Sequence, residues 1–216
     1  MLKKIFFCAL IIFSFVLSGC GEEKVIGTPD KAVLAYSELV TTGESANLAA
    51  AGFSENDRKN LRKVLIEIFA ETFKGVAPLS DASTEEIAQA FYANNKAKMT
   101  FSAKIKSDDK SNPVVELTAT PLDVSKAAGK VNDDMIALMG MVGKLKADGA
   151  TDEQLKENPE VQKLAVVAFG KYIGSIPVQE EKNFEIPCEK VTGTDGKTHW
   201  APTDVKALVD FITGKK

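Results

Sequence analysis

The feature that most limits how this chain can fold is its amino-terminal segment. Lys3 and Lys4 precede a run of 13 mainly apolar residues, from Ile5 to Leu17. A short positive region followed by such a run is typical of a secretory signal peptide. A transmembrane helix needs about 20 apolar residues, so this run is too short to span a bilayer. We therefore predict that residues 1–19 are a cleaved signal peptide and that the rest of the chain folds outside the cytoplasm.

A short motif closes the apolar run. Leu17-Ser18-Gly19-Cys20 resembles the lipobox of bacterial lipoproteins at all four positions. The resemblance implies cleavage between Gly19 and Cys20, a thioether-linked lipid on Cys20, and usually acylation of the new amino terminus, as with palmitate. The alternative is an ordinary signal peptide followed by a chance cysteine. Because two or three acyl chains hold a protein stably, the resemblance predicts a protein anchored to the cell membrane or the outer membrane.

The charge and cysteine content of the remaining chain restrict its partners. Without residues 1–19 it carries 25 basic and 30 acidic side chains, a net charge near −5. An acidic chain without a cluster of arginines is poorly suited to a phosphate backbone, so we predict no nucleic-acid partner. If Cys20 carries lipid, Cys188 has no partner for an intramolecular disulfide.

The length of the mature chain fits one domain. We predict that residues 20–28 form a lipidated amino terminus with a short tether, and that residues 29–216 form a single globular domain. Eight extended residues, 21–28, reach at most about 28 Å. The folded part should therefore stay close to its membrane.

Helical spacing of apolar residues and end signals predict several helices. For the first, Thr28 is the N-cap, Pro29 the first helical residue and Gly43 the stop. The third should open with Ser83 and Glu86 in a capping box. The other predicted helices begin after Ser54, Thr151, Asn158 and Thr203 or Asp204, and a long one runs from Val124 to Leu145.

Strict alternation predicts strands in two places. Residues 98–106 and 113–120, joined by a polar turn, are expected to form an antiparallel hairpin. A second pair is expected around Phe184–Cys188 and Thr198–Ala201. Since Pro187 cannot donate to a ladder, its strand is predicted to be an edge or a bulged strand. The fold class is therefore α+β, with helices packed on a small antiparallel sheet and a helical hairpin over residues 123–174 inserted between two strand pairs.

This order of an opening helix, a run of helices and antiparallel strands ending near Trp200 resembles the cystatin-like or nuclear-transport-factor-2-like cone folds. It is also similar to lipoprotein domains of unknown function. The helical hairpin departs from a simple cone. Such a fold implies no particular activity, because it hosts enzymes, binding proteins and scaffolds.

Few residues indicate chemistry. His199 is the chain's one histidine and is expected to be a surface or partly packed residue, because metal sites normally use several ligands at defined spacing. Cys188 shares a face with Phe184 and Ile186, which favours a small buried residue over a nucleophile. Asp108-Asp109 and Asp133-Asp134 lack the spacing of a calcium loop and are interpreted as turn and helix-start residues. We therefore predict no catalytic, cofactor-binding or metal-binding residues.

A lysine series gives the leading binding hypothesis. Lys98, Lys104 and Lys106, with Lys96 before them, place positive charge along one predicted strand. They could contact anionic headgroups or an acidic polymer, or serve as edge lysines that prevent sheet-to-sheet association. Met135, Met139 and Met141, with Gly140 and Gly143, similarly fit either a partner groove or a helix core.

We therefore predict a non-enzymatic envelope lipoprotein that binds an unidentified envelope protein or ligand near the membrane. One alternative is a small-molecule or peptide binder with a pocket between the sheet and its helices. A hydrolytic enzyme is the remaining alternative, and it requires a cleft with convergent polar groups.

Overall fold

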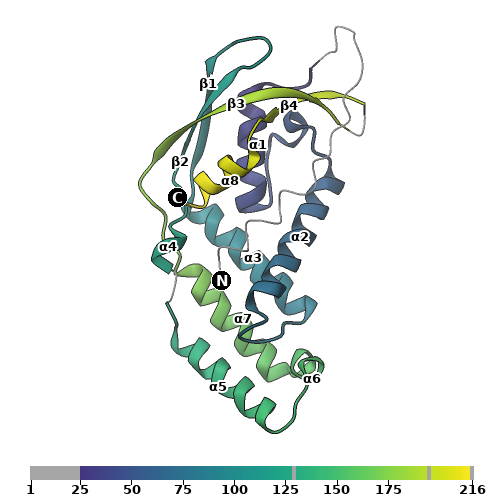
Figure 1. The fold of residues 1–216 in the computed structure, drawn as a ribbon, viewed down its shortest axis with the longest axis vertical. Helices are drawn as coiled ribbons and strands as arrows, with labels where there is room; N and C mark the ends of the chain where they lie inside the picture. The colour runs from purple at the N-terminus through teal and green to yellow at the C-terminus, as the bar shows by residue number, and fades with distance from the viewer. Residues whose placement is uncertain (1–24, 128–129, 194–195, 215–216) are drawn as a thin grey trace.

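A computed structural model describes residues 25–127, 130–193 and 196–214. It confirms the α+β class. The molecule is elongated, with a sheet and its covering helices at one end and a group of helices at the other (Figure 1). In chain order the elements are α1 (Pro29–Thr42), η3 (Leu48–Ala51), α2 (Glu55–Phe73), α3 (Asp81–Lys98), β1 (Phe101–Ser107), β2 (Val114–Ala119), α4 (Val124–Ala127), α5 (Asp133–Ala147), α6 (Asp152–Glu157), α7 (Pro159–Gly174), β3 (Lys182–Thr192), β4 (Thr198–Pro202) and α8 (Val205–Ile212).

The four strands form one antiparallel sheet in the order β1-β2-β3-β4. The predicted first hairpin is confirmed, with Phe101 opposite Ala119 and Ile105 opposite Val115. Val115, Leu117 and Ala119 point inward as predicted and are fully buried. Because β2 also pairs with β3, the two predicted strand pairs join into a single sheet.

The prediction that Pro187 marks an edge or bulged strand is wrong. Its strand, β3, lies between β2 and β4. The strand changes partner at this residue: Pro187 is the last residue opposite β2, and Cys188 is the first opposite β4. Although Pro187 has no N–H to donate, its carbonyl oxygen accepts a hydrogen bond from the Thr203 backbone N–H at 2.9 Å. A missing N–H is tolerated here because one ladder ends where the next begins.

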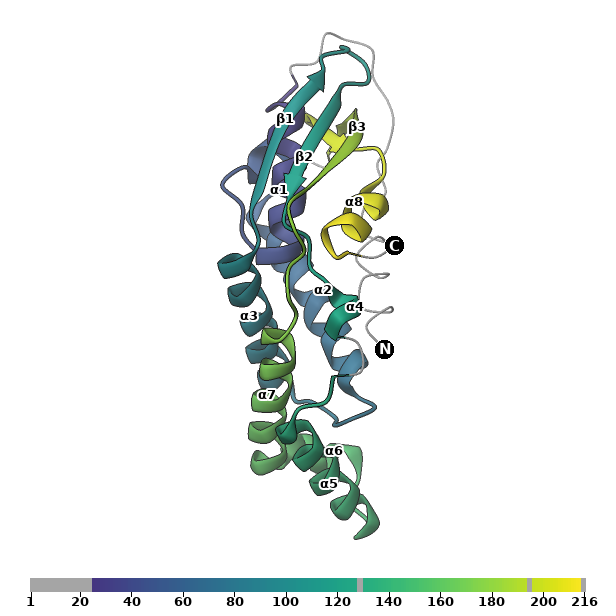
Figure 2. The same ribbon diagram turned by 90° about the vertical axis from the view of Figure 1, so that its left-hand side faces the viewer.

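The half of the molecule that contains the sheet has its own hydrophobic core, and we call it the sheet half. Helix α1 lies along one face of the sheet, and α8 and η3 close the same core (Figure 2). The core is built largely from small and medium side chains: Ala32, Val33, Ala35, Leu39, Val115, Leu117, Ala119, Ile186, Cys188 and Leu208.

The second core lies among α2, α3, α5, α6 and α7, and we call this part the helical half. Aromatic rings lie at its centre. Phe73 and Phe169 stack with their centroids 4.0 Å apart, and Phe69 meets Phe91 edge-on at 5.4 Å. Each such ring pair adds about 0.5–1.5 kcal/mol beyond the area it buries.

The two halves are in direct contact. Val40, Phe101 and Val205 each pack against both cores. The Asn95 side-chain amide on α3 also donates to the Thr41 carbonyl oxygen on α1 at 2.9 Å, and both residues are buried. A continuous set of contacts therefore links the sheet to the helices.

Most predicted helix ends are confirmed. Helix α1 begins at Pro29 after Thr28 and ends at Gly43, whose φ of 71° is left-handed. Ser54 and Asp57 form a reciprocal capping box at α2, and Thr151 and Gln154 do the same at α6. Helix α7 begins at Pro159 after Asn158, and Asp204 rather than Thr203 caps α8.

Two helix predictions are wrong. The third helix begins at Asp81, because the Ser80 hydroxyl accepts the Ser83 N–H and so supplies the N-cap one turn earlier. That helix also continues through Lys98, so the first strand starts at Phe101.

The predicted long helix from Val124 to Leu145 is two helices, α4 and α5. Asn132 starts the second by accepting the Met135 N–H at 2.8 Å. Its amide also donates to the Ala168 carbonyl oxygen on α7 at 3.0 Å. These bonds fix the start of α5 against α7. The spacing of apolar residues in the sequence does not indicate them.

The chain is already part of the fold before α1. The Ile26 backbone N–H donates to the Thr198 carbonyl oxygen at 2.8 Å, and Val25 packs on the sheet-half core. Residues 25 and 26 therefore contact the folded body, and residues 20–24 of the predicted tether lie outside the described residues. The predicted signal peptide, the lipobox and Cys20 lie outside the described residues.

Candidate functional site

A pocket of about 470 Å³ opens where the sheet meets the helices. It lies between the end of α1, the loop after it, the end of α3 and the start of β1. Its lining combines two carboxylates, a lysine and two hydroxyls with apolar side chains: Glu38, Thr42, Glu44, Ser45, Ala46, Lys96, Met99 and Phe101. A pocket between sheet and helices is the feature that a small-molecule binder requires.

The loop after α1 positions the polar side chains of this pocket. Gly43 turns the chain in a left-handed conformation, and a Cβ there would lie 2.7 Å from the Tyr92 ring, so glycine suits both the turn and the contact. The Thr42 hydroxyl donates to the Glu38 carbonyl oxygen at 2.8 Å and reaches the Glu44 carbonyl oxygen at 3.0 Å. The Ser45 hydroxyl donates to the Glu38 carboxylate. The loop is therefore held in one shape by its own side chains.

The charges in the pocket come from two elements. Lys96, in the last turn of α3, lies 2.9 Å from the Glu44 carboxylate. The hydrogen bond from Lys96, with its charge, holds the pKa of Glu44 below its ordinary value. Glu38 is half-buried and adds a second carboxylate to the lining, to which Met99 and Phe101 contribute apolar side chains. The site can thus accept hydrogen bonds from a cationic or hydroxylated ligand with an apolar part.

Each of Lys98, Lys104 and Lys106 lies beside a carboxylate or a backbone carbonyl oxygen. Lys104 lies 2.7 Å from Glu116 on β2, and Lys106 pairs with Glu185 on β3. Lys98 donates to the Gly174 carbonyl oxygen at 2.6 Å, at the end of α7. Positive charge along β1 is therefore balanced locally. Contact of Lys98, Lys104 and Lys106 with an anionic surface stays a prediction.

Cys188 and His199 lie in the sheet half, and neither lines the pocket. Cys188 is fully buried, and burial, with the charge of Asp30, raises the pKa of its thiol to about 12. His199 is buried beneath η3, where a Cβ on Gly52 would lie 2.6 Å from its ring. The expectation of a surface or partly packed histidine underestimated this burial, because the η3 turn that covers it has no sequence signal.

The acidic pairs have structural positions. Asp109 accepts the backbone N–H groups of Ser111 and Asn112, each at 2.8 Å, and so shapes the hairpin turn. Asp133 and Asp134 lie in the first turn of α5. In the described part of the chain, no group of three or more His, Cys, Asp or Glu residues is arranged to hold a metal ion.

No sequence motif marks the pocket. Glu38, Thr42 and Glu44 are ordinary polar residues at the end of a helix, and only Lys96 stood out, as a member of the lysine series. The chain brings them together by packing α3 against α1 more than 50 residues later, which no local spacing encodes.

In the described ranges, no helix is both long enough and apolar enough to cross a membrane. No protein-family model matches the chain, and no curated protein does. The fold is similar to that of a "putative lipoprotein (ycdA)" from Bacillus subtilis subsp. subtilis str. 168, with a TM-score of 0.53 and 17% sequence identity. The similarity covers 87% of this chain and 55% of that one, so the chain spans about half the length of the Bacillus protein, and the likeness shows the fold alone.

Proposed function

We propose that the chain is an envelope lipoprotein, held on a membrane by lipid on Cys20, with a non-enzymatic binding role near that membrane. The observation that carries the proposal is the motif Leu17-Ser18-Gly19-Cys20 at the end of the apolar run. Fold similarity to a protein named as a lipoprotein supports it. The bound partner is an envelope protein or ligand that is not yet identified, and nucleic acid is not expected.

The anchor would place the sheet half nearest the membrane. Val25 packs on the sheet-half core and Ile26 is bonded to β4. From Cys20 to Val25 an extended chain covers at most about 18 Å. The sheet half would therefore sit close to the headgroups, with the helical half as the part able to reach beyond it.

Labelled palmitate tests the anchor. We expect the wild-type chain to incorporate the label and to fractionate with membranes. Cys20→Ala should lose both properties, because the thiol that carries the thioether is gone. Cys8→Ala is the matched control, since Cys8 lies in the predicted signal peptide and should leave labelling unchanged. Equal label in Cys20→Ala and wild type would reject the anchor.

The pocket at α1, α3 and β1 favours a second candidate, binding of a small cationic ligand. Glu38 and Glu44 supply two carboxylates against one lysine, so the lining is acidic. Putrescine and other short alkyl diamines are suitable probes, because they combine ammonium groups with an apolar stem. Addition of putrescine should change the chemical shifts of the pocket residues, and these changes should vanish in Glu38→Gln. Glu86→Gln, an exposed change elsewhere on α3, should keep them, and shifts that survive Glu38→Gln would contradict the site.

An enzymatic role is not proposed. A hydrolase built on Cys188 or His199 would need these side chains in a cleft with access to substrate. Cys188 is instead buried with a raised thiol pKa, and His199 lies beneath η3. Alkylation of Cys188 in the folded protein at neutral pH would argue against this reasoning.

The cystatin-like or nuclear-transport-factor-2-like cone also remains a proposal. Its support is a helix, α1, that packs along a four-stranded antiparallel sheet. The inserted helices α5, α6 and α7 are an addition to such a cone. Superposition of an experimental structure of the sheet half on a cone domain would test it, and a mismatch in strand order would contradict it.

A further inference from the structure

Helix α5 has two very different faces. Met135, Leu138 and Val142 are buried in the helical-half core. On the outward side, Ile136 is 57% exposed and Met139 is 41% exposed. A helix face that meets only water normally carries polar or charged residues. The outward face of α5 is therefore apolar without contributing to the core.

Two glycines also leave part of the backbone on this outward face without side chains. At Gly140 and Gly143, no other atom lies within 4 Å of the position that a Cβ would take. Another helix could approach the backbone closely there, because no side chain keeps it away. Two further exposed apolar residues lie near the contact between α5 and α7: Val131, just before α5, is 50% exposed, and Val167, on α7, is 39% exposed. Both valines flank the bond between Asn132 and the Ala168 carbonyl oxygen that joins the two helices.

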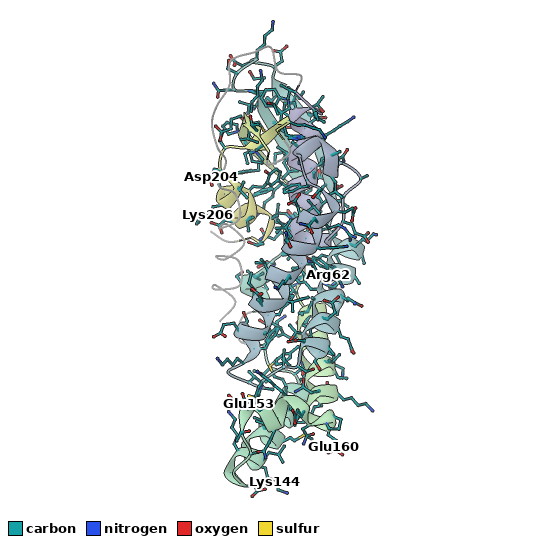
Figure 3. All side chains as sticks on the ribbon, turned by 90° about the vertical axis from the view of Figure 1, so that its right-hand side faces the viewer. Arg62, Lys144, Glu153, Glu160, Asp204 and Lys206 are labelled. Atoms are coloured by element: carbon teal, nitrogen blue, oxygen red, sulfur yellow. The ribbon has the colours of Figure 1, made fainter. Side chains whose placement is uncertain are left out.

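Opposite charges frame this face. Asp133 lies in its first turn and Lys144 in its last turn, and both are exposed. They are 11 residues apart, about three turns, so they project from nearly the same side of the helix. The nearby Asp134 forms an ion pair with Lys171, and the nearby Lys146 forms one with Asp152. No ion pair among the described residues involves Asp133 or Lys144. Figure 3 shows Lys144 at the tip of the molecule formed by the helical half.

We propose that the outward face of α5 binds a second copy of this chain, with the two α5 helices antiparallel. A two-fold axis near Met139 would place Asp133 of each copy beside Lys144 of the other. The same axis would bring Ile136 of each copy against the bare backbone at Gly140 of the other. A two-fold interface requires a self-complementary surface. The α5 face meets this requirement in charge and in shape about one midpoint, which an unrelated partner would have no reason to share.

The interface is expected to be weak in solution. One helix face with two valines buries less than the roughly 1,600 Å² of a standard protein–protein interface. Copies confined to one membrane surface would meet at a higher effective concentration. The measurement should therefore cover a wide range of protein concentrations.

Sedimentation equilibrium of the non-lipidated chain from Gly21 to Lys216 tests the proposal. We expect a monomer–dimer equilibrium in the wild type. Asp133→Lys and Lys144→Asp should each raise the dissociation constant by about tenfold or more, because each places like charges together twice. The double variant should restore association, since its charges are again opposite across the interface.

A second pair of variants separates the interface from folding. Gly140→Gln adds a side chain in open space, so the monomer should stay folded by circular dichroism while dimerisation weakens about tenfold. Gly174→Gln is the matched control, because Gly174 is also helical with open space at its Cβ position, and it should leave dimerisation unchanged. A wild type that stays monomeric, a double reversal that fails to restore dimers, or dimers insensitive to Gly140→Gln would each overturn the proposal.

Discussion

The sheet half and the helical half present opposite kinds of surface to water. On the sheet, exposed lysines of β1 pair with glutamates of β2 and β3, as in the pairs Lys104–Glu116 and Lys106–Glu185. Such pairs add little stability, at most about 1 kcal/mol each, but they cover the face with charge and discourage sheet-to-sheet association. On α5 the outward face is apolar and ends in unlike charges. The charged face of the sheet is therefore suited to contact with water, whereas the apolar face of α5 is available to a partner.

The two cores differ as well. The sheet-half core combines many small aliphatic side chains with the edge-on ring pair Tyr36–Phe53, whereas the helical-half core is centred on aromatic rings that meet both stacked and edge-on. Since Val40, Phe101 and Val205 belong to both, damage to one core should be felt in the other.

Phe169→Ala should produce the largest effect. The ring is fully buried and stacked on Phe73, so its removal should lower the free energy of unfolding by about 3–5 kcal/mol in a denaturant titration. Val167→Ala, an exposed change on the same helix, is the control and should cost less than about 0.5 kcal/mol.

The same variant tests whether the halves are coupled. Cys188 lies in the sheet half, and its raised thiol pKa and burial should prevent labelling until that half opens. If the halves unfold together, Phe169→Ala should speed thiol labelling of Cys188 at least about a hundredfold. Unchanged labelling would show that the two halves open independently.

Asn132→Ala should have a smaller and more local effect. It removes the N-cap of α5 and the bond to the Ala168 carbonyl oxygen, which should cost about 1–2 kcal/mol. Hydrogen exchange should rise in α5 and stay unchanged in β2. Asn60→Ala, an exposed change on α2, should be nearly neutral. Equal increases in α5 and β2 would contradict a local role.

The smallest effect concerns Glu44 at the junction of the halves. Lys96 lowers its pKa in the folded state, so the pair favours folding above the unfolded glutamate pKa of about 4.3. That contribution is lost as the pH falls through the lowered folded value. An NMR titration should give Glu44 a midpoint below the ordinary one. Lys96→Met should return the Glu44 midpoint to its ordinary value, whereas the control Lys163→Met should leave it lowered. An ordinary Glu44 midpoint in the wild type would refute the pairing.

Local sequence signals predicted the elements where the determining residues are adjacent. Alternation located β1 and β2, and the caps at Ser54 and Thr151 were read from neighbouring residues. The capping-box pattern at Ser83 and Glu86 was misleading, because the Ser80 hydroxyl accepts the Ser83 N–H and the N-cap falls three residues earlier. The break before α5 and the central position of β3 depend on contacts with α7 and β4, which lie elsewhere in the chain.

The candidate site was less predictable than the fold. Its pocket joins residues from α1 and α3 that carry no motif. The chemistry-bearing types that attract notice in a sequence, Cys188 and His199, are buried in the sheet half. Burial of a side chain by a distant segment such as η3 is a tertiary property, so the sequence supported only the expectation that these residues are not ligands.

We propose that lipid on Cys20 holds the sheet half at the membrane and the helical half away from it. Fluorophores on Lys110→Cys, in the β1–β2 turn, and on Lys156→Cys, in α6, would measure this in lipidated protein on vesicles with quenchers in the headgroups. We predict strong quenching at position 110 and weak quenching at position 156. Equal quenching at both positions, or stronger quenching at 156, would contradict the account.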